Sequence, residues 1–157
     1  KGGVLNIHAD FVSHPHRSTW RRRVNFLIYL NENWDEQWGG HLEFWNRDMK
    51  QCAQKIAPYF NRCVIFSTDA SSFHGHPEPL NCPSEISRRS IALYYFTEEG
   101  RELKVQSTNY RARPQDKGKQ WLIHFDNFMV NVYTILKRKL GINDKIVSRI
   151  LKIFSGK

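Results

Sequence analysis

Short runs of alternating apolar and polar residues, separated by turn-forming residues, extend from Val4 to about Phe96. Alternation with a period of two is typical of strands that bury one face. The runs predict strands near residues 4–9, 22–31, 41–46, 52–57, 62–67, 72–76 and 88–97. Gly39-Gly40 lies between two runs and predicts a hairpin. Because no helical periodicity interrupts the runs, we expect an antiparallel sandwich or barrel rather than an α/β fold.

The periodicity becomes helical after Gly100. Residues 101–120 are polar and are predicted to form an irregular connector. From about residue 121 the apolar residues follow a helical spacing, and a second helix is predicted after Gly141. Charge changes at the same place, since residues 1–100 contain 11 Lys/Arg and 11 Asp/Glu, whereas residues 101–157 contain 13 and 4. We therefore expect a β core at 1–100, a connector at 101–120 and a basic amphipathic helical tail at 121–157.

The basic tail has two interpretations. Its positive charge could contact an anionic partner such as nucleic acid, an acidic protein or a membrane surface. Alternatively, its apolar stripe, which includes Phe125, Met129 and Val132, packs on the barrel while the lysines and arginines stay in water. We favour the second interpretation, because the apolar faces of strands 4–9 and 22–31 need cover. No RNP-type motif or zinc-finger spacing supports nucleic-acid binding.

Composition excludes several other classes of protein. No apolar run reaches the roughly 18 residues that a transmembrane helix needs. The cysteines Cys52, Cys63 and Cys82 are odd in number and form no CxxC pair. A disulfide framework or a cysteine zinc site is therefore not expected, and a reducing, cytoplasmic compartment is preferred.

His8 and Asp10 carry the first chemical signal. They are two residues apart at a predicted strand, so their side chains share one face, while Ile7 and Ala9 lie on the apolar opposite face. A metal site needs this arrangement, in which two ligands lie side by side on a strand with a packed rear face. The third ligand must come from another strand that is close in space.

His74 and His76 are the candidates for the third ligand, and they too share a face. We favour His74, which follows Phe73 in a strand-like run, whereas Pro77 ends strand pairing directly after His76. Two histidines and one carboxylate leave three metal positions open, which suits a non-haem Fe(II) that binds a co-substrate and O₂ together. Zinc is the competing metal, although the HExxH helix of many zinc hydrolases is absent.

Arg88 begins the last predicted strand and is followed on its own face by the small residues Ser90 and Ala92. Arg89 falls on the opposite, bulky face. Because a guanidinium holds a carboxylate through two parallel hydrogen bonds, Arg88 is the candidate anchor for a dicarboxylic co-substrate. Tyr29, on the predicted strand 22–31, could donate a phenol hydrogen bond to the same carboxylate or could be a core tyrosine.

Taken together, these motifs resemble those of the 2-oxoglutarate- and Fe(II)-dependent dioxygenases of the prolyl 4-hydroxylase-like group. The motifs are His8-x-Asp10, LIYLN at 27–31, WGGHLEFW at 38–45, NRCVIFS at 61–67, FHGHPEP at 73–79 and RRSIALYYF at 88–96. The resemblance covers about residues 3–100. It implies a double-stranded β-helix, which is a jelly-roll, cupin-like barrel. It also implies that His8, Asp10 and His74 hold Fe(II), and that Arg88 and Tyr29 hold the C5 carboxylate of 2-oxoglutarate.

The resemblance also implies the reaction. A prolyl or related peptide side chain is expected to be hydroxylated with O₂ and 2-oxoglutarate, releasing succinate and CO₂, and ascorbate is an expected reductant. Asp10 favours hydroxylation over halogenation. Residues 11–22 are expected to form a substrate-selecting loop beside the metal. Because the family has elements upstream of its His-x-Asp motif, the chain is expected to be N-terminally truncated. Two other classes remain open: a non-catalytic cupin-like binding module, and a nucleic-acid-binding protein that acts through the basic tail.

Overall fold

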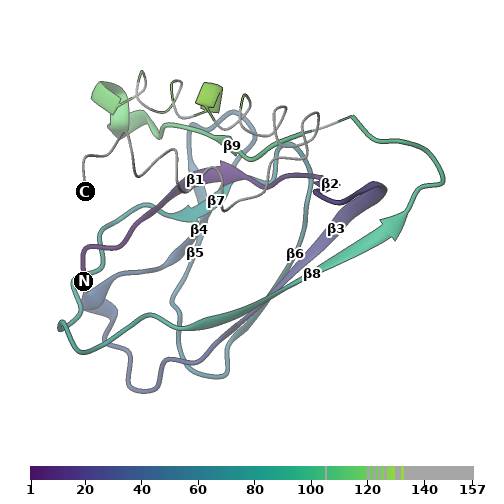
Figure 1. The fold of residues 1–157 in the computed structure, drawn as a ribbon. Coiled ribbons are helices and arrows are strands. Elements are labelled where there is room, and N and C mark those ends of the chain that lie inside the picture. Colours follow the sequence, from purple (N-terminus) through teal and green to yellow (C-terminus); the bar gives the residue numbers. More distant parts are fainter. Residues whose placement is uncertain are drawn as a thin grey trace, which may run out of the picture.

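The structure, a computed structural model, describes residues 1–104 and 106–119 together with 121, 123, 125, 127–129 and 132. Antiparallel strands make up most of the secondary structure in these residues (Figure 1). The strands are β1 (Leu5–Ala9), β2 (Ser13–His14), β3 (Arg17–Tyr29), β4 (Leu42–Trp45), β5 (Cys52–Ile56), β6 (Cys63–Ser67), β7 (His74–His76), β8 (Ser90–Glu98) and β9 (Asn109–Tyr110). Two short 3-10 segments span Glu36–Trp38 and Pro114–Lys119. The predicted mainly β class is confirmed.

The strands form two sheets. The first has the order β5-β4-β7-β1-β9, and all its pairings are antiparallel. In the second, β3 pairs with β8 along one edge and with β2 and β6 along the other. The chain therefore passes back and forth between the sheets, with β3, β6 and β8 in one and β4, β5 and β7 in the other. This connectivity is that of a double-stranded β-helix, as the resemblance implied.

A buried cluster joins the two sheets. Tyr29 of β3, Leu42 of β4 and Val64 of β6 are its buried members. On the opposite face of the first sheet lies a second cluster, formed by Ile7, Ala9, Trp45 and Phe73. Because side chains alternate along β1, the residue between Ile7 and Ala9 points to the space between the sheets. The first sheet thus packs its apolar rear face and presents polar side chains to the interior.

Three sequence expectations were wrong in detail. Gly39-Gly40 does not close a hairpin, because β3 and β4 lie in different sheets, and the link between them contains the 3-10 segment Glu36–Trp38. Residues 11–22 are not a loop, since they contain β2 and the start of β3, which pair with each other. The segment predicted as an irregular connector contributes β9, which pairs with β1. Local sequence did not reveal these pairings, because each depends on a strand that is brought alongside by the fold.

The predicted basic tail falls mostly outside the described residues. Among positions 121–132, the described residues have helical backbone. Ile123 is buried, whereas Phe125 and Met129, which the sequence placed in a packing stripe, are exposed. Asn127 fixes this segment to β9, because its side-chain amide both accepts from and donates to the backbone of Tyr110 at 2.8 Å. The tail's expected anionic partner stays a prediction. Within the described part of the chain, no helix has the length and apolarity that a membrane crossing requires.

Gly75 sits where β7 runs against β1, and replacing it with alanine is expected to destabilise the barrel. A Cβ there would lie 2.6 Å from the carbonyl oxygen of Leu5 and 2.8 Å from that of Asn6, so β1 would have to move. We expect Gly75→Ala to lower the free energy of unfolding by about 2 kcal/mol. Urea denaturation of the variant and the wild type would measure this difference in the free energy of unfolding. Gly3→Ala is the control, since its Cβ would meet only ordinary contact, 3.6 Å from Leu80 Cδ1. Equal stability of the two variants would contradict the spacing of β1 and β7.

Candidate metal centre

Three predicted ligands, His8, Asp10 and His74, meet between the two sheets. Strand pairing places His8 of β1 directly opposite His74 of β7, and Asp10 follows β1 immediately. The Nε2 atoms of His8 and His74 lie 3.6 Å and 3.5 Å from the Asp10 carboxylate. One ligand atom from each residue lies within 4.8 Å of the other two. The structure thus brings these side chains together and leaves His76 out of the group, while their binding of a metal stays a prediction.

Both imidazoles are oriented by the backbone. Nδ1 of His8 is 2.8 Å from the carbonyl oxygen of Asn6, and Nδ1 of His74 is 2.8 Å from that of Ser72. A carbonyl only accepts, so each Nδ1 carries the proton and each Nε2 keeps a free lone pair. Hydrogen bonding of the second ring nitrogen is also how metal-binding histidines are normally held. The donor set therefore fits a divalent ion on one open face.

Electrostatics favours the protonation states that a metal needs. Burial, with help from His8, lowers the pKa of His74 to about 4, so its ring is neutral at pH 7. Burial alone would raise the pKa of Asp10, but contact with His8, the charges of His74 and Arg22 and the Asn25 hydrogen bond lower it to about 2. Asp10 is therefore ionised. A neutral imidazole beside a carboxylate is the form in which both residues coordinate a cation.

Two residues that the sequence did not single out hold Asp10. Arg22 Nη2 lies 3.0 Å from Asp10 Oδ2, and Asn25 Nδ2 donates to the same oxygen at 2.6 Å. Both side chains are only 2% exposed. Asn25 had a detectable signal, since it shares the alternating face of Tyr29 and is polar on a face that the fold buries. Arg22 had none, because simple alternation places it on the apolar face of Val24, and only the register shift between Arg22 and Val24 turns it to the face of Asn25.

Arg88 and Tyr29 also come together. Arg88 lies two residues before β8 rather than inside a strand, and its Nη2 donates to the Tyr29 hydroxyl at 3.3 Å. Its Nε donates to the carbonyl oxygen of Gly40 at 2.8 Å. Gly40 has a φ of 74°, and a Cβ on it would lie 3.0 Å from Arg88 Cδ, so a glycine is required to seat this arginine. Arg89 is exposed. The role of Arg88 and Tyr29 as co-substrate anchors stays a prediction.

The pKa of His76 depends both on the candidate metal ligands and on Arg88. Its pKa is lowered to about 4, first by burial and then by the charges of Arg88 and His8. His76 faces the interior from β7, as His74 does, and its buried Nδ1 has no hydrogen-bond partner among the described residues. The guanidinium of Arg88 is therefore within electrostatic range of the region beside the histidine pair.

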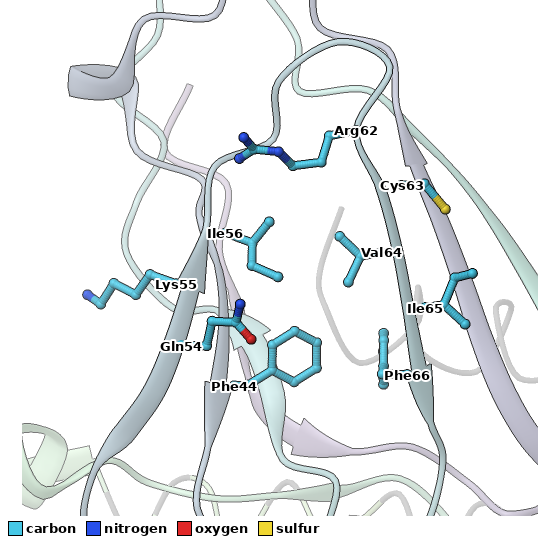
Figure 2. A pocket seen from close by; sticks show the side chains of 9 residues that line it. All are labelled: Phe44, Gln54, Lys55, Ile56, Arg62, Cys63, Val64, Ile65 and Phe66. Atoms are coloured by element: carbon cyan, nitrogen blue, oxygen red, sulfur yellow. The ribbon is translucent and has the colours of Figure 1, made fainter.

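A cavity of about 600 Å³ opens between β5 and β6, next to this region (Figure 2). Phe44, Ile56, Val64 and Phe66 point into it from the two sheets. Phe44 and Phe66 also form the boundary with the candidate metal centre, because their ring centroids lie 6.1 Å and 4.6 Å from that of His74. One side of the candidate metal centre is thus formed by aromatic rings.

The lowered histidine pKa values predict an acid-sensitive fold in metal-free protein. The unfolded chain takes up a proton at His74 near pH 6.5, but the folded chain does so only near pH 4. Stability from this residue is therefore complete above pH 6.5 and is lost as the pH falls towards 4, by about 3 kcal/mol. His76 acts in the same direction. Urea denaturation in chelator at pH 7 and pH 4.5 would measure the loss, and His74→Gln should show a shallower dependence. A free energy of unfolding that is the same at both pH values would rule out a destabilising protonation of His74.

Comparisons with known proteins agree on one family. Residues 1–97 match the family model described as the 2OG-Fe(II) oxygenase superfamily. Among curated proteins, the chain is similar to prolyl 3-hydroxylase OGFOD1 of Mus musculus, with 34% identity over 79 residues. That match covers 48% of this chain but only 14% of the mouse protein, so the chain spans a small part of its relative.

Solved structures of two prolyl hydroxylases are also similar. One is a prolyl hydroxylase from Trichoplax adhaerens in complex with a hypoxia inducible factor oxygen degradation domain peptide fragment. It has 29% identity and a TM-score of 0.47, and the match covers 61% of this chain and 39% of that one. The other is a prolyl 4-hydroxylase from Phytophthora capsici, with 25% identity and a TM-score of 0.45, covering 88% and 42% of the two chains.

Proposed function

Because this chain belongs to the 2OG-Fe(II) oxygenase superfamily, we propose that it hydroxylates a prolyl or related peptide side chain with Fe(II), O₂ and 2-oxoglutarate, releasing succinate and CO₂. The observation that carries the proposal is the cluster of His8, Asp10 and His74, whose ligand atoms lie within 4.8 Å of one another. Bound Fe(II) would supply the activation of O₂ that couples oxidative decarboxylation of the co-substrate to hydroxylation.

His8, Asp10 and His74 would hold the metal on one face. Their geometry supports a site with open positions, because His8 and His74 lie on paired strands of one sheet, and Asp10 directly follows the strand of His8. The chain's contribution is to keep the two Nε2 atoms unprotonated and to keep Asp10 ionised. Iron is preferred to zinc because the family of the chain uses Fe(II).

Arg88 and Tyr29 would orient the co-substrate. A dicarboxylate whose keto-acid end chelates the metal has a second carboxylate that needs a cation inside the barrel. Arg88 is a partly buried cation facing Tyr29, and no carboxylate is among its side-chain hydrogen-bond partners in the described part of the chain. A charged ligand in that position would therefore complete the guanidinium's hydrogen bonding.

A peptide substrate is supported by the name of the mouse relative, a prolyl 3-hydroxylase. We propose a prolyl or related side chain as the site of hydroxylation, with a small-molecule substrate as the alternative. Ascorbate is proposed as the reductant that keeps the iron as Fe(II). An anionic partner for the basic tail remains a hypothesis, because most of the tail lies outside the described residues.

Anaerobic titration of the full-length protein with Fe(II) and then 2-oxoglutarate tests the proposal without knowledge of the substrate. We expect the weak visible charge-transfer band of a 2-oxoglutarate chelate. Admission of O₂ with proline-containing peptides should then release succinate. Absence of the band would refute the proposed site. A band without succinate release on any peptide would instead favour the non-catalytic binding module.

A further inference from the structure

The Asp10 carboxylate is held asymmetrically, and this asymmetry has a functional consequence. Among the described residues, its two short polar contacts are both made to one oxygen, Oδ2, which lies 3.0 Å from Arg22 Nη2 and 2.6 Å from Asn25 Nδ2. Each oxygen also lies near one histidine, Oδ1 at 3.6 Å from His8 Nε2 and Oδ2 at 3.5 Å from His74 Nε2, and both distances are too long for a good hydrogen bond. The two oxygens therefore differ in their donors: two donors can use both in-plane lone pairs of Oδ2, whereas those of Oδ1 are available to an ion.

The two donors are themselves fixed. Asn25 Oδ1 accepts from Arg22 Nε at 2.7 Å and from the hydroxyl of Thr68 at 3.1 Å, so the amide cannot flip without losing both hydrogen bonds. The Arg22 guanidinium lies 3.8 Å from the ring centroid of Tyr94 and 4.7 Å from that of Phe11. Cation–π contact on a buried guanidinium adds to its hydrogen bonds. Neither donor can leave Oδ2 by a simple side-chain rotation.

We propose that Arg22 and Asn25 are positioning residues that make Asp10 a one-oxygen metal ligand, bound through Oδ1. The inference rests on the proposed function, since it concerns the same metal. Other carboxylate ligands can swing to bind a metal through both oxygens. Here that movement would break two hydrogen bonds to buried donors, one of them charged, and each such loss is costly.

One-oxygen binding decides how many ligands the metal can accept. A six-coordinate ion held by His8, His74 and Oδ1 would have three free positions, whereas two-oxygen binding by Asp10 would leave two. A co-substrate that chelates through two atoms would use two of them, and O₂ would need one more. Arg22 and Asn25 thus preserve the position that lets co-substrate and O₂ bind at the same metal.

The test counts the waters on bound Mn(II), because water-proton relaxation scales with the number of coordinated waters. For the full-length wild type we expect relaxation corresponding to three. In Asn25→Ala, which removes the neutral donor, we expect the relaxation to fall by about a third and succinate release to fall roughly 10- to 100-fold. Arg22→Lys is a second variant, which keeps the charge but loses the forked donor geometry. A purely structural role would not change the water count.

Thr68→Val is the matched control, since it removes one hydrogen bond from Asn25 and none from Asp10. Its water count should equal that of the wild type. Three waters in both Asn25→Ala and Arg22→Lys, or two in the wild type, would overturn the positioning role while leaving the proposed function standing. Failure of the wild type to bind Mn(II) or Fe(II) at all would overturn the proposed function itself.

Discussion

Replacing Asp10 with alanine is expected to lower 2-oxoglutarate-dependent succinate release by roughly a thousandfold or more. The variant removes the one anionic ligand, so a divalent ion would be left with His8 and His74. It also leaves Arg22 as a buried cation whose only carboxylate partner in the described part of the chain is gone. An unpaired buried charge repels a metal ion and destabilises the fold. Succinate release and Fe(II) affinity measured in the full-length protein would quantify both losses.

Glu32→Ala is the control for Asp10→Ala, because it removes an exposed carboxylate remote from the histidine pair in sequence. Its succinate release should equal that of the wild type. Far-ultraviolet circular dichroism and thermal melting of Asp10→Ala would separate loss of metal from loss of fold. Turnover in a folded Asp10→Ala protein equal to that of the wild type would eliminate the metal centre proposed for His8, Asp10 and His74.

Replacing Arg88 with glutamine is expected to raise the KM for 2-oxoglutarate roughly 10- to 150-fold. A hydrogen bond to a charged group contributes about 1.5–3 kcal/mol, and each 1.36 kcal/mol corresponds to a factor of ten. Arg88 contacts Tyr29 and the backbone of Gly40, both of which are neutral, so its charge is available to a ligand. The effect should fall on co-substrate binding and leave Fe(II) affinity close to that of the wild type.

Arg89→Gln is the matched control for Arg88→Gln, because it makes the same chemical change one residue away. The Arg89 side chain is exposed, and the residue is held by its backbone: its N–H donates to Asn31 Oδ1 and its carbonyl oxygen accepts from the N–H of Leu30. We expect its KM for 2-oxoglutarate to be unchanged. If the two variants behaved alike, another residue would have to bind the far carboxylate. His76, whose Nδ1 has no hydrogen-bond partner in the described part of the chain, would be the next residue to replace.

Much of the fold could be predicted from alternation. Each of the seven predicted strand regions contains a strand of the structure, because a barrel strand buries one face and shows this in every second residue. The two strands that the sequence missed were missed for one reason. β2 and β9 are only two residues long, too short to show a period, and they exist because a neighbouring strand supplies their hydrogen bonds.

The residues of the candidate site also fall into those that could be predicted from the sequence and those that could not. His8, Asp10 and His74 could be predicted because metal ligands are a restricted set of residue types and share a strand face at a spacing of two. Arg22 could not, since arginines are common on surfaces and nothing local marks this one as buried. Asn25 gave only the weak signal of a polar residue on the face of Tyr29. Only the packing of β3 under Asp10 turns them into hydrogen-bond donors for a carboxylate.

The sequence by itself therefore determined the mainly β class, the family resemblance and the residue types that could bind a metal and a dicarboxylate. Each of these can be inferred from local periodicity or from the chemistry of single side chains. The tertiary structure decided which strands pair, that His8 lies opposite His74, and which oxygen of Asp10 is held by Arg22 and Asn25. These are contacts between distant parts of the chain, and their geometry follows from packing two sheets together rather than from any local pattern.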